Sequence, residues 1–192
     1  MQANDVKNAK VALFLADGCE EIEALTVYDL LFRSSIPVTL ISITDSLLVT
    51  SSHGVRITAD TTIGDIDFDE FDMLVLPGGL PGTTNLGSCT LLTDKVKEFY
   101  ACGKQIAAIC AAPSVFAKLG LLDGRKATCN PSFENVLAEN GALLTKEAVT
   151  VSDNVTTSQG MGTAIAFGLS IVEHYKGKEA ADDLGRKVLY YR

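Results

Sequence analysis

The sequence has 192 residues, of which 47% are hydrophobic, and a formal net charge of −8. We expect one domain over residues 1–192, since this length can bury a sizeable core. The acidic balance, without a basic stripe, argues against binding to nucleic acid or to anionic membranes. The first ten residues are polar and lack the apolar segment of a signal peptide, and no apolar run reaches bilayer length. We therefore expect a cytoplasmic protein.

The predicted elements alternate between strand and helix along the chain. In chain order, we expect a strand at 10–16, a helix within 17–35, a strand at 36–43, a hairpin at 47–60, a strand at 72–79, a helix at 93–103, a strand at 104–110, a helix at 112–122, short strands at 126–129, 142–151 and 155–159, and helices at 160–177 and 178–191. Gly103 is the expected C-cap of one helix, and Pro113 lies in the first turn of the next.

The main predicted strands are continuous apolar runs rather than alternating ones, which indicates strands buried on both faces. The sequence therefore predicts an α/β sandwich, with a mostly parallel central sheet, helices on both faces and a small β-hairpin. In such a fold the functional site lies at the carboxyl ends of the strands. Three segments reach that edge: 17–23, 77–85 and 110–114.

The five cysteines show neither CxxC spacing nor a histidine at metal-ligand spacing; they are Cys19, Cys89, Cys102, Cys110 and Cys129. We expect reduced thiols, no disulfide framework and no metal site. Cys110 differs from the others because it ends a buried strand just before a helix, the position of a nucleophile elbow. The positive end of that helix is expected to lower the pKa of the thiol. The alternative is a packed core cysteine.

The other two strand-end segments offer partners for this thiol. Gly78 and Gly79 allow close backbone approach, and their amides with that of Ala111 are expected to form an oxyanion hole. On the first helix, Glu23 is expected to point inward on the side of Ile22 and Thr26. A carboxylic acid buried there has a raised pKa and can donate a hydrogen bond to sulfur.

The neighbouring glutamates, Glu20 and Glu21, are expected to face solvent. The sequence has only two histidines. His53 lies on the hairpin turn, and His174 lies near the end of the long helix, where we expect it to face solvent. A papain-like pair of cysteine and histidine is therefore not predicted.

Four stretches together are similar to the DJ-1/ThiJ/PfpI superfamily, whose members have the class I glutamine amidotransferase-like fold: VALFLADGCEEIEA, VLPGG, IAAICAAPSVFAKLGLLDGRKAT, and the S-x-G-x-G-T pattern at 158–163. The resemblance implies a flavodoxin-like sandwich that forms a twofold homodimer. It also implies that Cys110 is an oxidation-sensitive nucleophile, that Glu23 is its protonated partner, and that Arg33 lies near the subunit interface. Gly78, Gly79 and Ala111 match the lining of the family's anion pocket.

The sequence departs from the family pattern at three positions. Asn130 stands where many members have a histidine, and an amide cannot act as a general base. Gln159 replaces a common arginine, which removes a positive charge from the mouth of the expected pocket, and His53 stands where another arginine is frequent. We expect the hairpin to bring His53 towards the partner's pocket, as a partial replacement for the lost positive charge.

The first helix gives a second reason to expect a dimer. It carries apolar residues that can form a self-complementary patch: Val27, Leu30 and Leu31.

Two functional hypotheses follow. In the first, Cys110 attacks a small reactive carbonyl such as methylglyoxal, or a glycated substrate, in glyoxalase/deglycase-type chemistry without a cofactor. The amides of Gly79 and Ala111 hold the oxyanion and Glu23 moves the proton. In the alternative, the protein is a redox sensor or redox-regulated chaperone that acts through oxidation of Cys110 to sulfinate.

Overall fold

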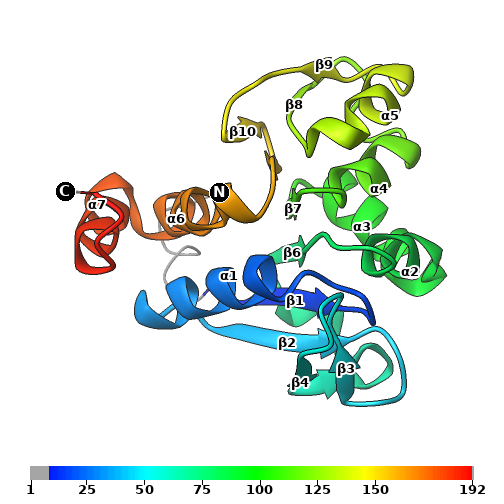
Figure 1. Ribbon diagram of the computed structural model, residues 1–192, viewed down its shortest axis with the longest axis horizontal. Helices are drawn as coiled ribbons and strands as arrows, with labels where there is room; N and C mark the ends of the chain where they lie inside the picture. Colours follow the sequence, from blue (N-terminus) through cyan, green and yellow to red (C-terminus); the bar gives the residue numbers. More distant parts are fainter. Residues whose placement is uncertain (1–8, 192) are drawn as a thin grey trace.

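A seven-stranded sheet forms the centre of the computed structural model, which describes residues 9–191 (Figure 1). Its strands are β1 Val11–Leu15, β2 Val38–Ser42, β5 Thr61–Thr62, β6 Met73–Leu76, β7 Gln105–Ile109, β10 Val149–Ser152 and β11 Val155–Ser158. They lie in the order β10-β11-β7-β6-β1-β2-β5, and every neighbouring pair is parallel except β10 with β11. The mostly parallel sheet is therefore confirmed.

Two small sheets flank the central one. The expected hairpin consists of β3 (Leu48–Thr50) and β4 (Arg56–Thr58), which pair antiparallel. In the second small sheet, β8 (Lys126–Ala127) pairs in parallel with β9 (Leu143–Leu144). The region expected as one strand at 142–151 therefore divides into β9 and β10, which belong to different sheets.

Helices cover both faces of the sheet. One layer contains α1 Glu21–Arg33, α6 Ala164–Lys176 and α7 Lys178–Lys187, and the other contains α2 Gly82–Ser88, α3 Thr90–Ala101, α4 Pro113–Lys118 and α5 Glu134–Glu139. Within residues 9–191 there are also four 3-10 turns: Ile63–Asp65, Phe68–Glu70, Pro131–Phe133 and Met161–Thr163. The expected sandwich is confirmed, whereas β5, α2 and α5 do not follow from the sequence pattern.

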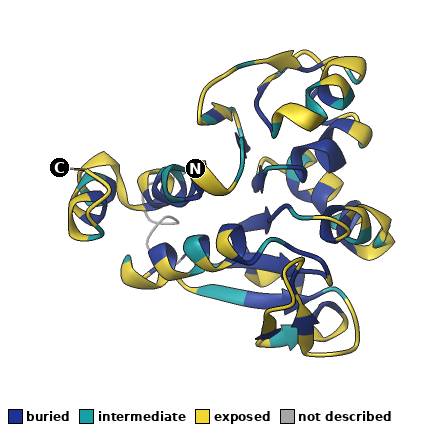
Figure 2. Ribbon diagram, in the orientation of Figure 1, coloured by how far each residue is buried: buried dark blue, intermediate teal, exposed yellow. Residues whose placement is uncertain are grey.

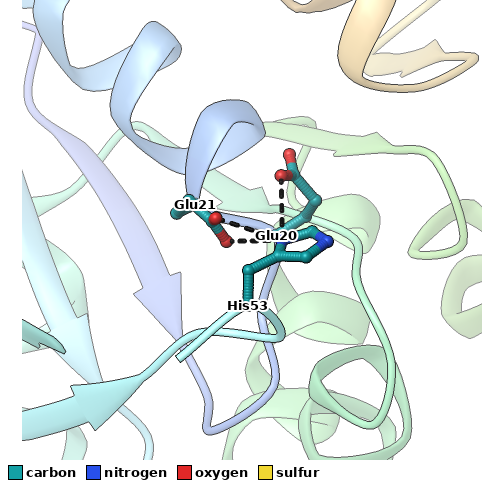
Figure 3. A group of neighbouring side chains, drawn as sticks. All are labelled: Glu20, Glu21 and His53. Atoms are coloured by element: carbon teal, nitrogen blue, oxygen red, sulfur yellow. Dashed lines mark hydrogen bonds and ion pairs between the residues drawn. The ribbon is translucent and has the colours of Figure 1, made fainter. Parts of the chain in front are cut away.

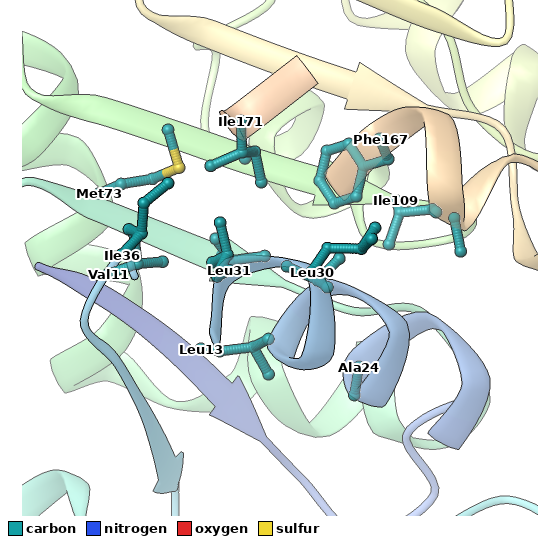
Figure 4. Close-up of a cluster of buried hydrophobic side chains, with 14 of the residues drawn as sticks. Val11, Leu13, Ala24, Leu30, Leu31, Ile36, Met73, Ile109, Phe167 and Ile171 are labelled. Atoms are coloured by element: carbon teal, nitrogen blue, oxygen red, sulfur yellow. The ribbon is translucent and has the colours of Figure 1, made fainter. Parts of the chain in front are cut away.

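Strand β1 shows why the strands are continuously apolar. Its five residues are all buried (Figure 2). Successive side chains of a strand point to opposite faces of the sheet. Leu13 belongs to the apolar cluster beneath α1 and α6, together with Leu30 and Phe167 (Figure 4), whereas Phe14 belongs to the cluster on the other face. A strand with a core on each side needs apolar residues at every position.

Helix α1 buries the face that we expected to be available for dimerisation. Val27, Leu30 and Leu31 are between 0% and 2% exposed, so the prediction that they form a surface patch is wrong. They belong to the cluster between the sheet and α6. The exposed apolar side chains of α1 include Ile22 and Leu25, so Ile22 does not share the inward direction of Glu23.

No helix within residues 9–191 is long and apolar enough to cross a bilayer. The polar N-terminal segment at 1–8 lies outside the described residues. The single domain expected over residues 1–192 stays a prediction.

Candidate active site

Cys110 occupies the turn between β7 and α4. Its φ of +66° lies in the left-handed region, which non-glycine residues seldom adopt, so the backbone is strained there as in a nucleophile elbow. Two hydrogen bonds hold this conformation: the Cys110 amide donates to the Ser158 carbonyl at 3.0 Å, and the Cys110 carbonyl accepts from the Asn130 amide at 2.8 Å. The half-buried thiol is thereby fixed at the carboxyl edge of the sheet.

Glu23 lies in the first turn of α1 and reaches the same edge. Its side chain is 1% exposed, and its Oε2 atom accepts a 2.8 Å hydrogen bond from the Gly78 amide. Its carboxyl group also interacts with the Cys110 thiol. Burial raises the pKa of Glu23 from its ordinary value of 4.5 to about 7, although hydrogen bonds with Cys110 and Gly78 oppose this rise. The side chain of Glu23 therefore points inward, as expected.

Gly78 and Gly79, which follow β6, lie so close to neighbouring atoms that neither position has room for a side chain. A Cβ atom on Gly78 would lie 2.6 Å from Cys110 Cβ and 2.7 Å from Glu23 Oε2. At Gly79, where φ is +88°, a Cβ atom would lie 2.4 Å from the Glu20 amide nitrogen. Glycine alone fits at both positions without displacing the site.

These glycines have different roles. The Gly78 amide is engaged with Glu23, whereas the amides of Gly79 and Ala111 approach the sulfur of Cys110. The Gly78 amide therefore positions the carboxyl group, and only the amides of Gly79 and Ala111 lie beside the sulfur. The oxyanion hole expected from these amides stays a prediction.

The thiol of Cys110 is a weaker acid than we expected. Burial, together with the charge and hydrogen bond of Glu23, raises its pKa from 9.0 to about 12, against the opposing effect of the Ala111 and Gly79 amides. The structure contradicts the predicted low pKa. The following helix, α4, has only six residues, so the field of its N-terminus is small beside the effects of burial and the neighbouring carboxylate.

Asn130 and Gly160 lie beside Cys110 and Glu23. A Cβ atom on Gly160 would lie 3.7 Å from Asn130 Nδ2, 3.8 Å from Cys110 Sγ and 3.8 Å from Glu23 Oε1, and these are its nearest neighbours. The three functional groups therefore surround one open point. Sequence reasoning did not single out Gly160. Its neighbour Gln159 is half-buried at the end of β11, and its predicted contribution to the pocket stays a prediction.

His53 pairs with glutamates of its own chain (Figure 3). Its Nδ1 atom lies 3.0 Å from Glu21 Oε1 and 3.9 Å from Glu20 Oε1. Among the described residues, these three side chains form the one group whose ligand atoms are close enough to share a metal ion. The predicted role of His53 at a partner's pocket stays a prediction.

Glu21 is buried, contrary to the expectation that it faces solvent. Although burial acts in the opposite direction, hydrogen bonds from its own backbone amide, His53 and Ser51 lower the pKa of its carboxyl group. The carboxylate of Glu21 thus links the hairpin turn to the start of α1.

The two other residues named from the sequence lie elsewhere. Arg33, at the opposite end of α1 from Glu23, is about 15 Å away along the helix axis. It forms an exposed ion pair with Asp29, and its predicted place at a subunit interface stays a prediction. His174 is exposed on α6, as expected.

Comparisons with known proteins identify the family to which this chain is similar. Residues 9–174 match the model of the DJ-1/PfpI family. Protein DJ-1 homolog A of Arabidopsis thaliana is 38% identical over 93% of this chain, which spans 46% of that relative's length. Proteins named glutathione-independent glyoxalase from Caenorhabditis elegans and Schizosaccharomyces pombe are each 34% identical, over 91% and 88% of this chain and 94% and 93% of their own lengths.

A solved structure shows the same fold. Oxidised DJ-1 of Toxoplasma gondii is 35% identical, with a TM-score of 0.90 over 96% of this chain and 100% of that one. The match in sequence covers most of the chain and includes all three segments that build the pocket. The chain therefore belongs to the DJ-1/PfpI family.

Proposed function

We propose that this protein is a glyoxalase or deglycase-type enzyme that acts on small reactive carbonyls such as methylglyoxal, or on glycated substrates. The observation that carries the proposal is the buried carboxyl group of Glu23 beside the Cys110 thiol, at an elbow where the Gly79 and Ala111 amides approach the sulfur. The names of the two glyoxalase relatives support the same chemistry.

In the first step, Cys110 Sγ attacks the aldehyde carbon of methylglyoxal. Glu23 accepts the proton of the thiol as the S–C bond forms and the carbonyl π bond breaks. A base with a pKa of about 7 is well matched to this transfer near neutral pH. The amides of Gly79 and Ala111 donate to the developing alkoxide, which then takes the proton to give a hemithioacetal.

The second step is internal. Glu23 removes the proton from C1 of the hemithioacetal, and a proton is returned to C2 through an enediol. C1 is thereby oxidised and C2 reduced within one molecule, so the electrons balance without a cofactor. Water then cleaves the resulting thioester, releasing lactate and the Cys110 thiol. The chain's own residues supply a nucleophile, a proton carrier and two amide donors for this sequence.

Steady-state lactate formation from methylglyoxal tests the proposal. The wild type and Cys110→Ser are compared after removal of free thiol and trace metal, with Cys102→Ser as control because Cys102 is also a free cysteine but is exposed. We expect Cys110→Ser to abolish turnover and Cys102→Ser to retain it. Equal rates in wild type and Cys110→Ser would refute the assignment.

A second candidate function is redox sensing through Cys110, favoured by the similarity to an oxidised DJ-1 structure. The raised pKa of the thiol opposes it, because oxidation proceeds through the thiolate. Mild peroxide followed by peptide mass spectrometry tests this role. Conversion of Cys110 to sulfinate before the other thiols, in a protein that makes no lactate, is the result that supports the sensor.

We also propose a homodimer and a cytoplasmic location. The dimer proposal rests on a surface groove beside α1, with Ile22 46% exposed and Leu25 37% exposed. The lining residues are Ile22, Leu25, Thr26, Asp29, Ile165 and Val188, together with Leu30, which is itself only 2% exposed. A second copy can cover this apolar face around a twofold axis. The proposed location rests on the five free cysteines.

A further inference from the structure

Helices α2 and α4 are neighbours in the same layer (Figure 1), and a groove of about 190 Å³ lies between them. Its lining residues come from the two helices, from Leu80 just before α2, and from Phe133. Cys110 and Glu23 are not among them. The groove is therefore separate from the candidate active site.

A glycine keeps this groove open. Gly87 of α2 faces Val115 of α4, since a Cβ atom on Gly87 would lie 3.4 Å from Val115 Cγ2, in ordinary van der Waals contact. The backbone of Gly87 is helical, so its conformation does not require glycine, and glycine weakens a helix. A larger side chain at this position would occupy the space between the two helices.

An unsatisfied hydroxyl group belongs to the wall of the groove. Thr83 lines it and lies four residues before Gly87, on the same face of α2. The residue is 4% exposed, and its Oγ1 atom is buried without a hydrogen-bond partner of ordinary geometry in the described part of the chain. On the other side of the groove, Ser114 of α4 is 2% exposed. A buried hydroxyl without a partner is costly, which indicates that a ligand completes the site.

The charge of the groove indicates the kind of ligand. Among the described residues that line it, Lys118 alone is charged, although the whole chain has a net charge of −8. Lys118 lies one turn after Ser114 on α4 and is exposed at the rim. Leu80 and Leu119 add apolar surface. One cation, buried hydroxyls and an apolar wall complement a small anion with an apolar body.

We propose that the groove between α2 and α4 binds a small organic acid. Its carboxylate accepts hydrogen bonds from the Thr83 hydroxyl and the flexible Lys118 side chain, and its apolar body packs against Leu80 and Val115. A cavity of about 150 Å³ can hold benzene. A groove of about 190 Å³ therefore suits an acid the size of a single aromatic ring with its carboxylate. Binding here does not depend on turnover at Cys110.

Titration of the whole chain with benzoate, followed by the chemical shifts of backbone amides, tests the proposal. Benzyl alcohol has a similar shape without the charge and is the neutral comparison. Thr83→Val removes the hydroxyl group and keeps the shape of the side chain, Gly87→Leu fills the groove, and Lys118→Gln removes the charge. Lys126→Gln is the control, since Lys126 is an exposed lysine on β8, outside the groove.

We expect saturable binding of benzoate to the wild type and to Lys126→Gln with equal affinity. Thr83→Val should weaken it about 3- to 10-fold, Lys118→Gln about 2- to 5-fold, and Gly87→Leu should abolish it. Denaturant unfolding guards against a folding defect: Thr83→Val should be at least as stable as the wild type, because it removes an unsatisfied hydroxyl group.

No saturable binding of benzoate to the wild type would overturn the proposal, as would full affinity in both Thr83→Val and Gly87→Leu. Equal affinity of the wild type for benzyl alcohol and benzoate would overturn the assignment of an anionic ligand.

Discussion

The pair formed by Glu23 and Cys110 shows how one buried environment acts on two acids. Burial raises the pKa of both groups, to about 7 for Glu23 and about 12 for Cys110. Such a pair retains one proton across the range between these values, and that proton belongs to the two groups jointly. Cys110 therefore does not need to be a free thiolate. Its proton can move to an adjacent carboxylate at the moment of attack.

Glu23→Gln should make the Cys110 thiol more acidic while removing activity. The substitution removes the negative charge that raises the pKa of Cys110, so we expect that pKa to fall below the wild-type value. Thiolate ultraviolet absorbance measured against pH reports this change. Lactate formation should nevertheless fall about 10²- to 10⁴-fold, because glutamine cannot accept a proton. A higher thiol pKa in Glu23→Gln would show that the carboxyl group stabilises the thiolate instead.

Glu23 should also make the protein less stable as the pH rises. Its folded pKa of about 7 exceeds the ordinary 4.5, so the folded state binds this proton more tightly than the unfolded state. The stabilisation is complete below pH 4.5 and is lost as pH rises through 7. Between about pH 5.5 and 8, the free energy of unfolding should fall by roughly 2 kcal/mol more in a protein that has Glu23 than in one that carries Glu23→Gln.

Denaturant unfolding of Cys110→Ser and of Cys110→Ser with Glu23→Gln measures that difference, since serine removes the thiol titration from both proteins. Equal pH dependence in the two proteins would mean that Glu23 titrates near its ordinary value.

At this scale the sequence predicts residue positions better than it predicts their properties. Cys110, Glu23 and Gly79 follow from segments at the strand ends, and all three meet in the structure. The pKa of Cys110 does not follow, because it depends on burial and on a charge contributed by another segment. The direction of the Asn130 amide depends on a hydrogen bond from Ser132, which the residue pattern does not reveal.

Among the elements, α1 sets the position of the carboxyl group. Glu20 is its N-cap, and its Oε2 atom accepts from the Glu23 amide at 2.9 Å. The Glu20 amide donates in turn to the Gly78 carbonyl at 2.9 Å, which ties the helix start to the end of β6. The N-terminus of the helix and the glycine bend are therefore one hydrogen-bonded unit.

Glu20→Ala should lower the free energy of unfolding by about 1 kcal/mol, the usual cost of losing an N-cap side chain. Thermal or denaturant unfolding measures it, with the exposed Glu139→Ala at the end of α5 as control. The control should change stability by less than about 0.5 kcal/mol. Equal effects of the two substitutions would remove the capping role of Glu20.

Helix α2 shows why some elements escape prediction. Its sequence, GTTNLGS, has two glycines and two threonines, which have low helix propensity. Tertiary contacts stabilise it instead: Leu86 is fully buried, and Asn85 Nδ2 donates to the Asp17 carbonyl at 2.8 Å. Long apolar elements such as β1 and α6 follow from pattern alone, whereas α2 depends on the partners that the fold brings to it.

For the whole molecule, the continuous apolar strands predict the sandwich, but not which surface remains uncovered. The period of α1 does not show which of its apolar residues meet α6, so it does not predict that Val27, Leu30 and Leu31 are buried. The exposed face carries Ile22 and Leu25 instead. That face is the surface on which the proposed dimer depends.

Leu25→Glu should convert the proposed dimer to a monomer, because a buried unpaired charge at the centre of an interface is strongly unfavourable. Light scattering at micromolar concentration gives the mass directly, and Leu91→Glu on α3 is a matched control because Leu91 is 45% exposed. We expect twice the chain mass for wild type and Leu91→Glu, and a single chain mass for Leu25→Glu. A monomeric wild type would contradict the dimer.

The central claim is that Glu23 is the base that activates a neutral Cys110 thiol, and the pH dependence of kcat/KM for methylglyoxal tests it most directly. Because protonated Glu23 cannot accept the thiol proton, kcat/KM should fall about tenfold per pH unit below 7 and reach a plateau above it. An increase that continues beyond about pH 9 would assign the chemistry to the free thiolate. A profile that is flat from about pH 5 to 9 would contradict the role of Glu23 altogether.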